Sequence, residues 1–151
     1  MAKVLTQAQK DSVLSLVARA DKRLSGAEAA ARRSNPSEGE YDNNFDGVVT
    51  AIFHVVDAFE LARTGVKRRV GDADQPIVIQ SVVTNLKAAG IGSVPAAMRL
   101  IDLNRRRNAS VHDDWLEVLD TESLDDAIEA ARGLLTAVQA YLVKIGLAPA
   151  K

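Results

Sequence analysis

The apolar residues of this chain recur with the spacing of one helix face over almost its whole length, and this periodicity constrains the fold most strongly. The carboxyl-terminal segment is the clearest case. Its acidic start at Ser123-Leu124-Asp125-Asp126 resembles a capped first turn, and Gly146 and Pro149 are typical of a helix end. Between them, ten residues form one stripe: Leu124, Ala127, Ile128, Ala131, Leu134, Leu135, Val138, Tyr141, Leu142 and Ile145.

Two further long helices are predicted in the amino-terminal half. Thr6-Gln7-Ala8-Gln9 reads as a capping box, so a helix is expected from about Gln7 to about Arg33, with Gly26 as a weak point inside it. After a loop over residues 34–40, a second helix is expected from near Asn44 to Lys67 or Arg69. Its broad apolar arc predicts burial on more than one side, and contains Val48, Val49, Ile52, Phe53, Val55, Val56 and Phe59.

Shorter elements fill the middle of the chain. Residues 77–88 predict a third helix, although the β-branched run over residues 77–79 is also compatible with a short strand. Pro95 suits the first turn of a fourth helix, in which Met98, Ile101 and Leu100 are expected to face inward. The prediction is an all-α antiparallel bundle of about five helices in a single domain, residues 1–151.

Composition excludes several classes of function. No cysteine is present, so the chain has no disulfide, thiolate catalyst or cysteine-ligated zinc. The net charge of −1 does not suit a protein that coats nucleic acid, and the aromatic content of 4% does not suit stacking on single strands. We interpret the basic runs at 32–33 and 67–69 as solvated helix ends. Without an apparent signal peptide or membrane span, a cytoplasmic, non-membrane protein is expected.

One short segment, residues 103–112, combines the side chains needed for work on a phosphodiester. It contains Arg105, Arg106, Arg107, Asn108 and His112. Histidine transfers protons near neutral pH, and arginine offers a planar fork of donors to phosphate. On a continuous helix Asn108 and His112 share a face, whereas Arg107 lies about 140° away from His112. Trp115 follows within one turn and is expected either to wall the site or to anchor the helix end.

Residues 107–112, Arg-Asn-Ala-Ser-Val-His, resemble the Arg-x4-His motif of HEPN domains, including the polar residue after the arginine. The run over residues 51–59 is similar to the apolar second helix of many HEPN proteins, and the order of long and short helices also agrees. Many HEPN domains are metal-independent endoribonucleases on helical bundles. The resemblance therefore implies RNA cleavage through the RNA's own 2′-hydroxyl, without a cofactor or metal.

In that reading Arg107, Asn108 and His112 are catalytic, and Arg105, Arg106 and Trp115 bind substrate. The resemblance further implies a homodimer that brings two motifs into one cleft, and a toxin or phage-defence component with an antitoxin partner. The alternative is a non-catalytic HEPN-like module that binds a nucleotide or a protein.

Several neighbouring residues leave alternatives open. Asp114 stands where some HEPN toxins have a tyrosine, which argues against that subgroup, and Asp113 and Asp114 would favour the imidazolium of His112. His112 could instead be an ordinary helix-end histidine. Asp57 and Glu60 are candidate supporting acids that could pair with Arg107 if they face the motif.

The second histidine, His54, lies within an apolar run, and we expect a buried, hydrogen-bonded core side chain there. A metal site built from His54, Asp57 and His112 is conceivable, but nothing in their spacing demands it. We therefore assign no metal.

Overall fold

A computed structural model describes residues 4–31, 38–66, 75–112 and 121–148, apart from the side chains at 38–43, 45, 75, 104, 106–112 and 121–123. These ranges form five α-helices and contain no strand. The helices are α1 (Gln7–Ala31), α2 (Glu38–Thr64), α3 (Gln75–Ala88), α4 (Ala97–His112) and α5 (Thr121–Lys144). The all-α bundle predicted from the apolar periodicity is confirmed.

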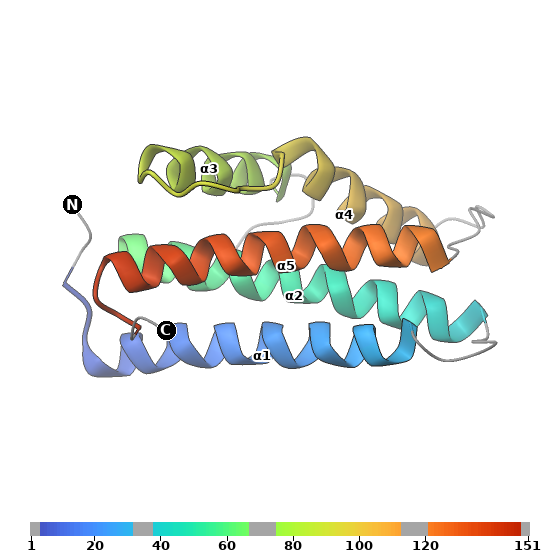
Figure 1. Cartoon of the computed structure of the whole chain (residues 1–151), viewed down its shortest axis with the longest axis horizontal. Coiled ribbons are helices and arrows are strands. Elements are labelled where there is room, and N and C mark those ends of the chain that lie inside the picture. Colours follow the sequence, from blue (N-terminus) through green and yellow to red (C-terminus); the bar gives the residue numbers. More distant parts are fainter. Residues whose placement is uncertain (1–3, 32–37, 67–74, 113–120, 149–151) are drawn as a thin grey trace.

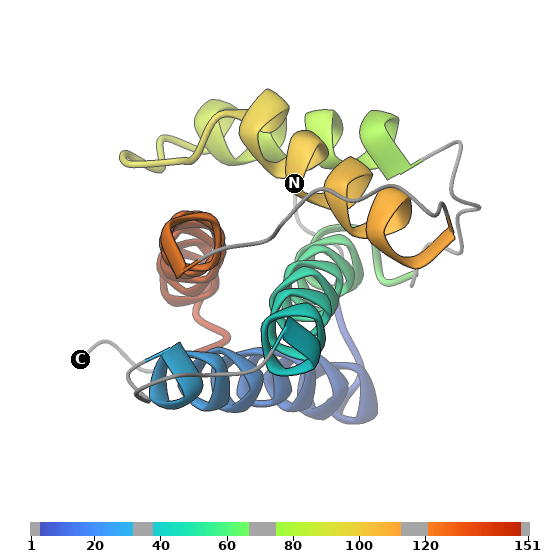
Figure 2. The ribbon, with the colours of Figure 1, turned by 90° about the vertical axis from the view of Figure 1, so that its right-hand side faces the viewer.

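The helices are arranged in three layers (Figure 1). α2 and α5 form the middle layer, α1 lies on one side of it, and α3 and α4 lie on the other, as the end view in Figure 2 also shows. α1 runs antiparallel to both α2 and α5. The carboxyl end of α4 reaches the same end of the bundle as the amino ends of α2 and α5.

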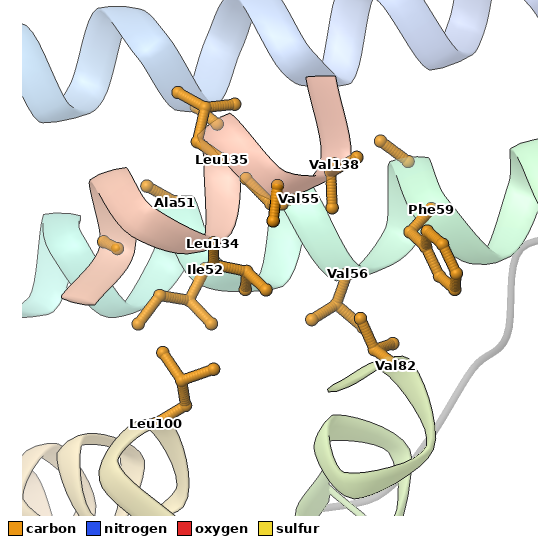
Figure 3. Packing of buried hydrophobic residues seen from close by; sticks show 14 of the residues in the cluster. Ala51, Ile52, Val55, Val56, Phe59, Val82, Leu100, Leu134, Leu135 and Val138 are labelled. Atoms are coloured by element: carbon orange, nitrogen blue, oxygen red, sulfur yellow. The ribbon is translucent and has the colours of Figure 1, made fainter. Parts of the chain in front are cut away.

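α2 is the most enclosed helix because it packs against both outer layers and against α5. Figure 3 shows Ile52 of α2 close to Leu100 of α4 and Leu134 of α5, and Val56 close to Val82 of α3. The prediction that the broad apolar arc of α2 is buried on more than one side is therefore confirmed. Each fully buried aliphatic side chain stabilises the fold by about 1.5–3 kcal/mol relative to an exposed one.

Side-chain and backbone caps fix the helix ends. The Thr6 amide donates to Gln9 Oε1 (2.9 Å) and the Gln9 amide donates to Thr6 Oγ1 (3.1 Å), so the predicted capping box is confirmed. Gln9 Nε2 also donates to the Gly65 carbonyl at the end of α2 (3.0 Å), which ties two helix ends together. Gly146 ends α5 with a φ of 77°, and the amides of Gly146 and Leu147 close a Schellman motif on Val143 and Leu142.

Some predicted boundaries were wrong. α2 begins at Glu38 rather than near Asn44, where two glutamates favour a helix amino end, and it stops at Thr64, before Lys67. Gly65 follows with a φ of 75°, a left-handed conformation that ends the helix. α5 begins at Thr121, so Ser123 lies inside the first turn and does not precede it. The strand alternative for residues 77–79 is wrong because they are helical.

The start of α4 also differs from the prediction. Pro95 precedes the helix by two residues, and the Ala96 carbonyl accepts the first helical hydrogen bonds, from Arg99 and Leu100. Leu100 is buried as expected, but Met98 is 70% exposed and Ile101 is only half-buried. Met98 lies about 160° round the helix from Leu100, so the two side chains cannot both face the core.

A polar cluster joins α1 to α5 at Arg132. Arg132 Nε donates to Glu28 Oε1 (2.8 Å), Arg132 Nη2 donates to Ser25 Oγ (2.9 Å), and Arg132 Nη1 pairs with Asp21. Burial lowers the pKa of Arg132, but the hydrogen bonds with Asp21 and Glu28 outweigh it and raise the pKa above its ordinary value. One arginine therefore holds two acids and a hydroxyl of the neighbouring helix.

We expect Arg132→Met to lower the free energy of unfolding by about 1–2 kcal/mol in urea denaturation. Hydrogen bonds to charged groups contribute about 1.5–3 kcal/mol when buried, but solvent screening reduces that value here because the Asp21 side chain is 56% exposed. The matched control is Lys22→Met, an exposed cation on α1, which should change stability by less than about 0.5 kcal/mol. Equal losses in both variants would contradict a specific role for Arg132.

Candidate functional site

The Arg-x4-His segment forms the carboxyl-terminal half of α4, and its backbone is helical through His112. Helical geometry therefore applies to the whole motif. Positions 108 and 112 lie one turn apart on a shared face, and positions 107 and 112 are separated by about 140°. Backbone positions 107 and 112 therefore do not belong to one face of α4.

The buried residues of α4 show which of its helical positions face the core. Leu100 and Leu103 are 0% and 4% exposed. Position 107 is seven residues after Leu100, so its backbone position differs by only about 20° and continues the inward register. Position 112 is seven residues after Arg105, whose side chain is 80% exposed, and it continues the outward register.

Most of the predicted site side chains lie outside the described part of the chain. Their predicted roles remain predictions, and the residues are Arg106, Arg107, Asn108, His112, Asp113, Asp114 and Trp115. Arg105 is described, and its Nη2 donates to Asp102 Oδ1 at 2.6 Å on the same helix. Because both side chains are solvent-exposed, this pair contributes little stability, and a phosphate could displace Asp102 at small cost.

The two candidate supporting acids lie in the last third of α2. Figure 1 shows the carboxyl end of α4 beside the opposite, amino-terminal end of α2. Glu60 is 3% exposed, and its described partner is Arg63 on the same helix, with Arg63 Nη2 at 3.2 Å from Glu60 Oε2. Asp57 is half-buried and has an interaction partner. The structure thus gives Glu60 a local counter-ion among the described side chains, and its pairing with Arg107 stays a prediction.

Glu60, Arg63 and Tyr141 form a polar cluster that sequence reasoning missed. The Arg63 side chain is 34% exposed, but its Nε is buried and has no hydrogen-bond partner among the described residues. Tyr141 of α5 stacks at a tilt on Phe59, with ring centroids 4.8 Å apart. Burial raises the pKa of Tyr141, and the positive charge of Arg63 lowers it in part. The Glu60–Arg63 spacing of three residues was the available signal for this cluster.

His54 is half-buried in α2, which is less than the buried core side chain that we expected, and it interacts with another residue. Across the described side chains, no group of three or more His, Asp or Glu residues is arranged to hold a metal ion. His112 is outside that search, so the combination of His54, Asp57 and His112 is not tested. None of the described helices is long and apolar enough to cross a membrane.

A shallow hollow of about 620 Å³ lies on the α1 side of the molecule, on the layer opposite α4. Ser12, Ser15 and Arg19 of α1 line it, and Leu61 of α2 contributes an apolar wall. Asp11 also lines it, so a cation and an anion are both present. The hollow has no contact with the motif helix among its lining residues.

Comparison of the chain with family models, with curated proteins and with solved structures found no match in any of the three.

We expect one of the two tyrosines to ionise above the ordinary pKa of 10.0 in the folded protein, because burial disfavours the phenolate of Tyr141. A raised folded-state pKa means that this contribution to stability is complete below pH 10.0 and is lost as the pH rises through the folded value. Ultraviolet titration of the phenolate absorbance measures it. Tyr141→Phe should remove the late transition, and a late transition that persists would contradict the assignment.

Proposed function

We propose that the chain is a metal-independent endoribonuclease that works as a homodimer, with its active site at the carboxyl end of α4. The observation that supports this most is the uninterrupted helical backbone through His112, which gives the Arg-x4-His segment a regular geometry at one end of the bundle. The exposed Arg105 in the same segment supplies a cation that can reach a phosphate. The cytoplasm is the compartment in which we place this activity.

The proposed reaction is attack of an RNA 2′-oxygen on the adjacent phosphorus. A histidine accepts the 2′-hydroxyl proton, the new P–O bond forms, and the bond to the 5′-oxygen breaks as that oxygen receives a proton. His112 suits the proton transfers, and Arg107 suits stabilisation of the charge that develops on the phosphorus oxygens. Asn108 would orient His112, while Arg105, Arg106 and Trp115 would contact the substrate.

A second copy of the chain answers two difficulties of this mechanism. One histidine per chain is too few for two simultaneous proton transfers, and positions 107 and 112 continue different registers of α4. In a two-fold dimer the same patch serves both subunits, so one chain can supply what the other lacks. Met98, which is 70% exposed, and half-buried Ile101 place apolar surface on α4 that a symmetry mate can cover.

The net charge of −1 favours a second candidate, a non-catalytic module that binds a nucleotide or a protein partner such as an antitoxin. A protein without net positive charge attracts long RNA only through local patches. Such a module would use Arg107 for a phosphate and would need no proton transfer. The two candidates differ in whether the bound RNA or nucleotide is cleaved.

We expect purified protein to cleave RNA in EDTA, and His112→Ala to lower the cleavage rate by about 10²–10⁴-fold, the usual contribution of a positioned acid–base group. Gel electrophoresis of end-labelled RNA measures the rate and identifies a 2′,3′-cyclic phosphate product. His54→Gln is the matched control, since His54 is the other of the two histidines, and it should retain cleavage.

Absence of cleavage on all RNA classes tested would contradict the ribonuclease proposal. Nucleotide binding without turnover that is lost in Arg107→Ala would favour the second candidate. If Arg107→Ala and His112→Ala both leave binding and cleavage unchanged, the motif has a structural role and both proposals fail.

We expect a dimer at micromolar concentration in sedimentation velocity, and Met98→Asp to shift it toward monomer, because a buried carboxylate at the two-fold interface lacks a partner. Lys22→Asp on α1, the layer opposite α4, is the control and should leave the dimer intact. A wild-type chain that stays monomeric over this range would contradict the composite site.

A further inference from the structure

The segment that precedes α4 passes very close to the middle of α5. A Cβ atom added to Gly133 of α5 would lie 2.9 Å from Cγ and 3.7 Å from Cδ of Pro95. Real Cβ atoms do not approach a neighbour to 2.9 Å, and ordinary contact begins at about 3.4 Å. The pyrrolidine ring therefore occupies space that any other residue at position 133 would fill.

Glycine inside a helix costs about 0.5–1 kcal/mol relative to alanine, so Gly133 is an unfavourable choice for α5 alone. The chain offers a direct comparison, since a Cβ added to Gly26 in α1 or Gly47 in α2 meets no described atom within 4 Å beyond the helix's own nearby backbone. Close approach of Pro95 is thus a local reason for glycine at 133 that does not apply to the other two positions.

Pro95 is well placed to determine where α4 begins. It lies directly before Ala96, whose carbonyl accepts the first hydrogen bonds of α4, and its ring fixes the backbone φ there. Arg99, one turn further on, contacts α5 through the Asp126 carbonyl (3.2 Å) and the Glu129 carboxylate (3.8 Å). These exposed polar contacts are weak, whereas the contact between Pro95 and Gly133 is limited by hard atomic overlap.

We propose that the Pro95–Gly133 contact is the positioning element that sets the placement of the start of α4, and through it the placement of the Arg-x4-His segment. This inference rests on the proposed ribonuclease function for its catalytic consequence. Gly133→Ala must displace the Pro95 ring by about half an ångström, from 2.9 to 3.4 Å or more. A helix is stiff along its axis, so the motif at its far end moves with its start.

Gly133→Ala leaves the proposed catalytic residues of α4 unchanged, so we expect it to act only by moving the Arg-x4-His segment. A misplacement of 1 Å can cost about 10²-fold in rate, and half that distance corresponds to about tenfold in kcat. Removing the ring in the double variant Gly133→Ala/Pro95→Ala eliminates the overlap and should restore most of that loss. Pro95 and Gly133 are positioning residues because neither is proposed to touch RNA.

The test combines amide NMR with kinetics in the full chain. In Gly133→Ala we expect amide shifts to change along α4, including positions beyond Arg105, and kcat to fall with little change in KM. Gly26→Ala and Gly47→Ala are matched controls, which should leave α4 amides and cleavage unchanged and stabilise the fold slightly. Thermal unfolding of each variant establishes that the fold is intact at the assay temperature.

Amide changes confined to the surroundings of residues 95 and 133 would overturn the proposal, and so would a double variant that restores neither the shifts nor kcat. If the wild-type chain cleaves no RNA, the proposed function fails, and the amide shifts still decide whether Pro95 and Gly133 position α4. If Gly133→Ala unfolds, Pro95→Ala alone removes the same contact, and α4 amide shifts that stay unchanged beyond Arg105 in that variant would overturn the proposal.

Discussion

Burial of α2 is the constraint on which the rest of the structure depends. Most of its residues from Val48 to Ala62 are buried among the other helices, and α1, α3, α4 and α5 all pack against it. Such a helix cannot place a charge inward without a partner, because a lone buried charge is costly. Glu60 is the described charged residue that is fully buried, and Arg63 one turn away lies close enough to neutralise it.

The sequence predicted the helices well wherever one apolar stripe faces one neighbour. The stripe of α5 is buried from Leu124 to Leu142 as expected, and the Thr6–Gln9 capping box forms with both hydrogen bonds. The sequence predicted helix ends and the inward face of α4 less well, because contacts with other helices determine them. Met98 was assigned inward because it is apolar, but Leu100 and Leu103 fix the rotation of α4, and the position of Met98 follows from theirs.

The sequence could predict how the residues of the candidate site are spaced along α4, but not which residues of other helices lie beside them. Six consecutive residues define the motif, and a regular helix then determines how positions 107, 108 and 112 are related. Which acid from another helix lies nearby depends on the axial offset between α2 and α4, and no local pattern contains that offset. Glu60 was therefore a reasonable candidate from sequence, yet its described partner in the structure is Arg63.

α5 links the two outer layers through adjacent residues. Arg132 holds the acids of α1, and Gly133, one position further, accepts Pro95 ahead of α4. Neighbouring positions on a helix differ by about 100°, which allows one turn of α5 to face both layers at once. Among the described side chains on the outward register of α4, Arg105 is 80% exposed and Met98 is 70% exposed. A helix fixed along its inner face and at its start, with Met98 and Arg105 exposed on its outer face, is suited to present side chains to a second molecule.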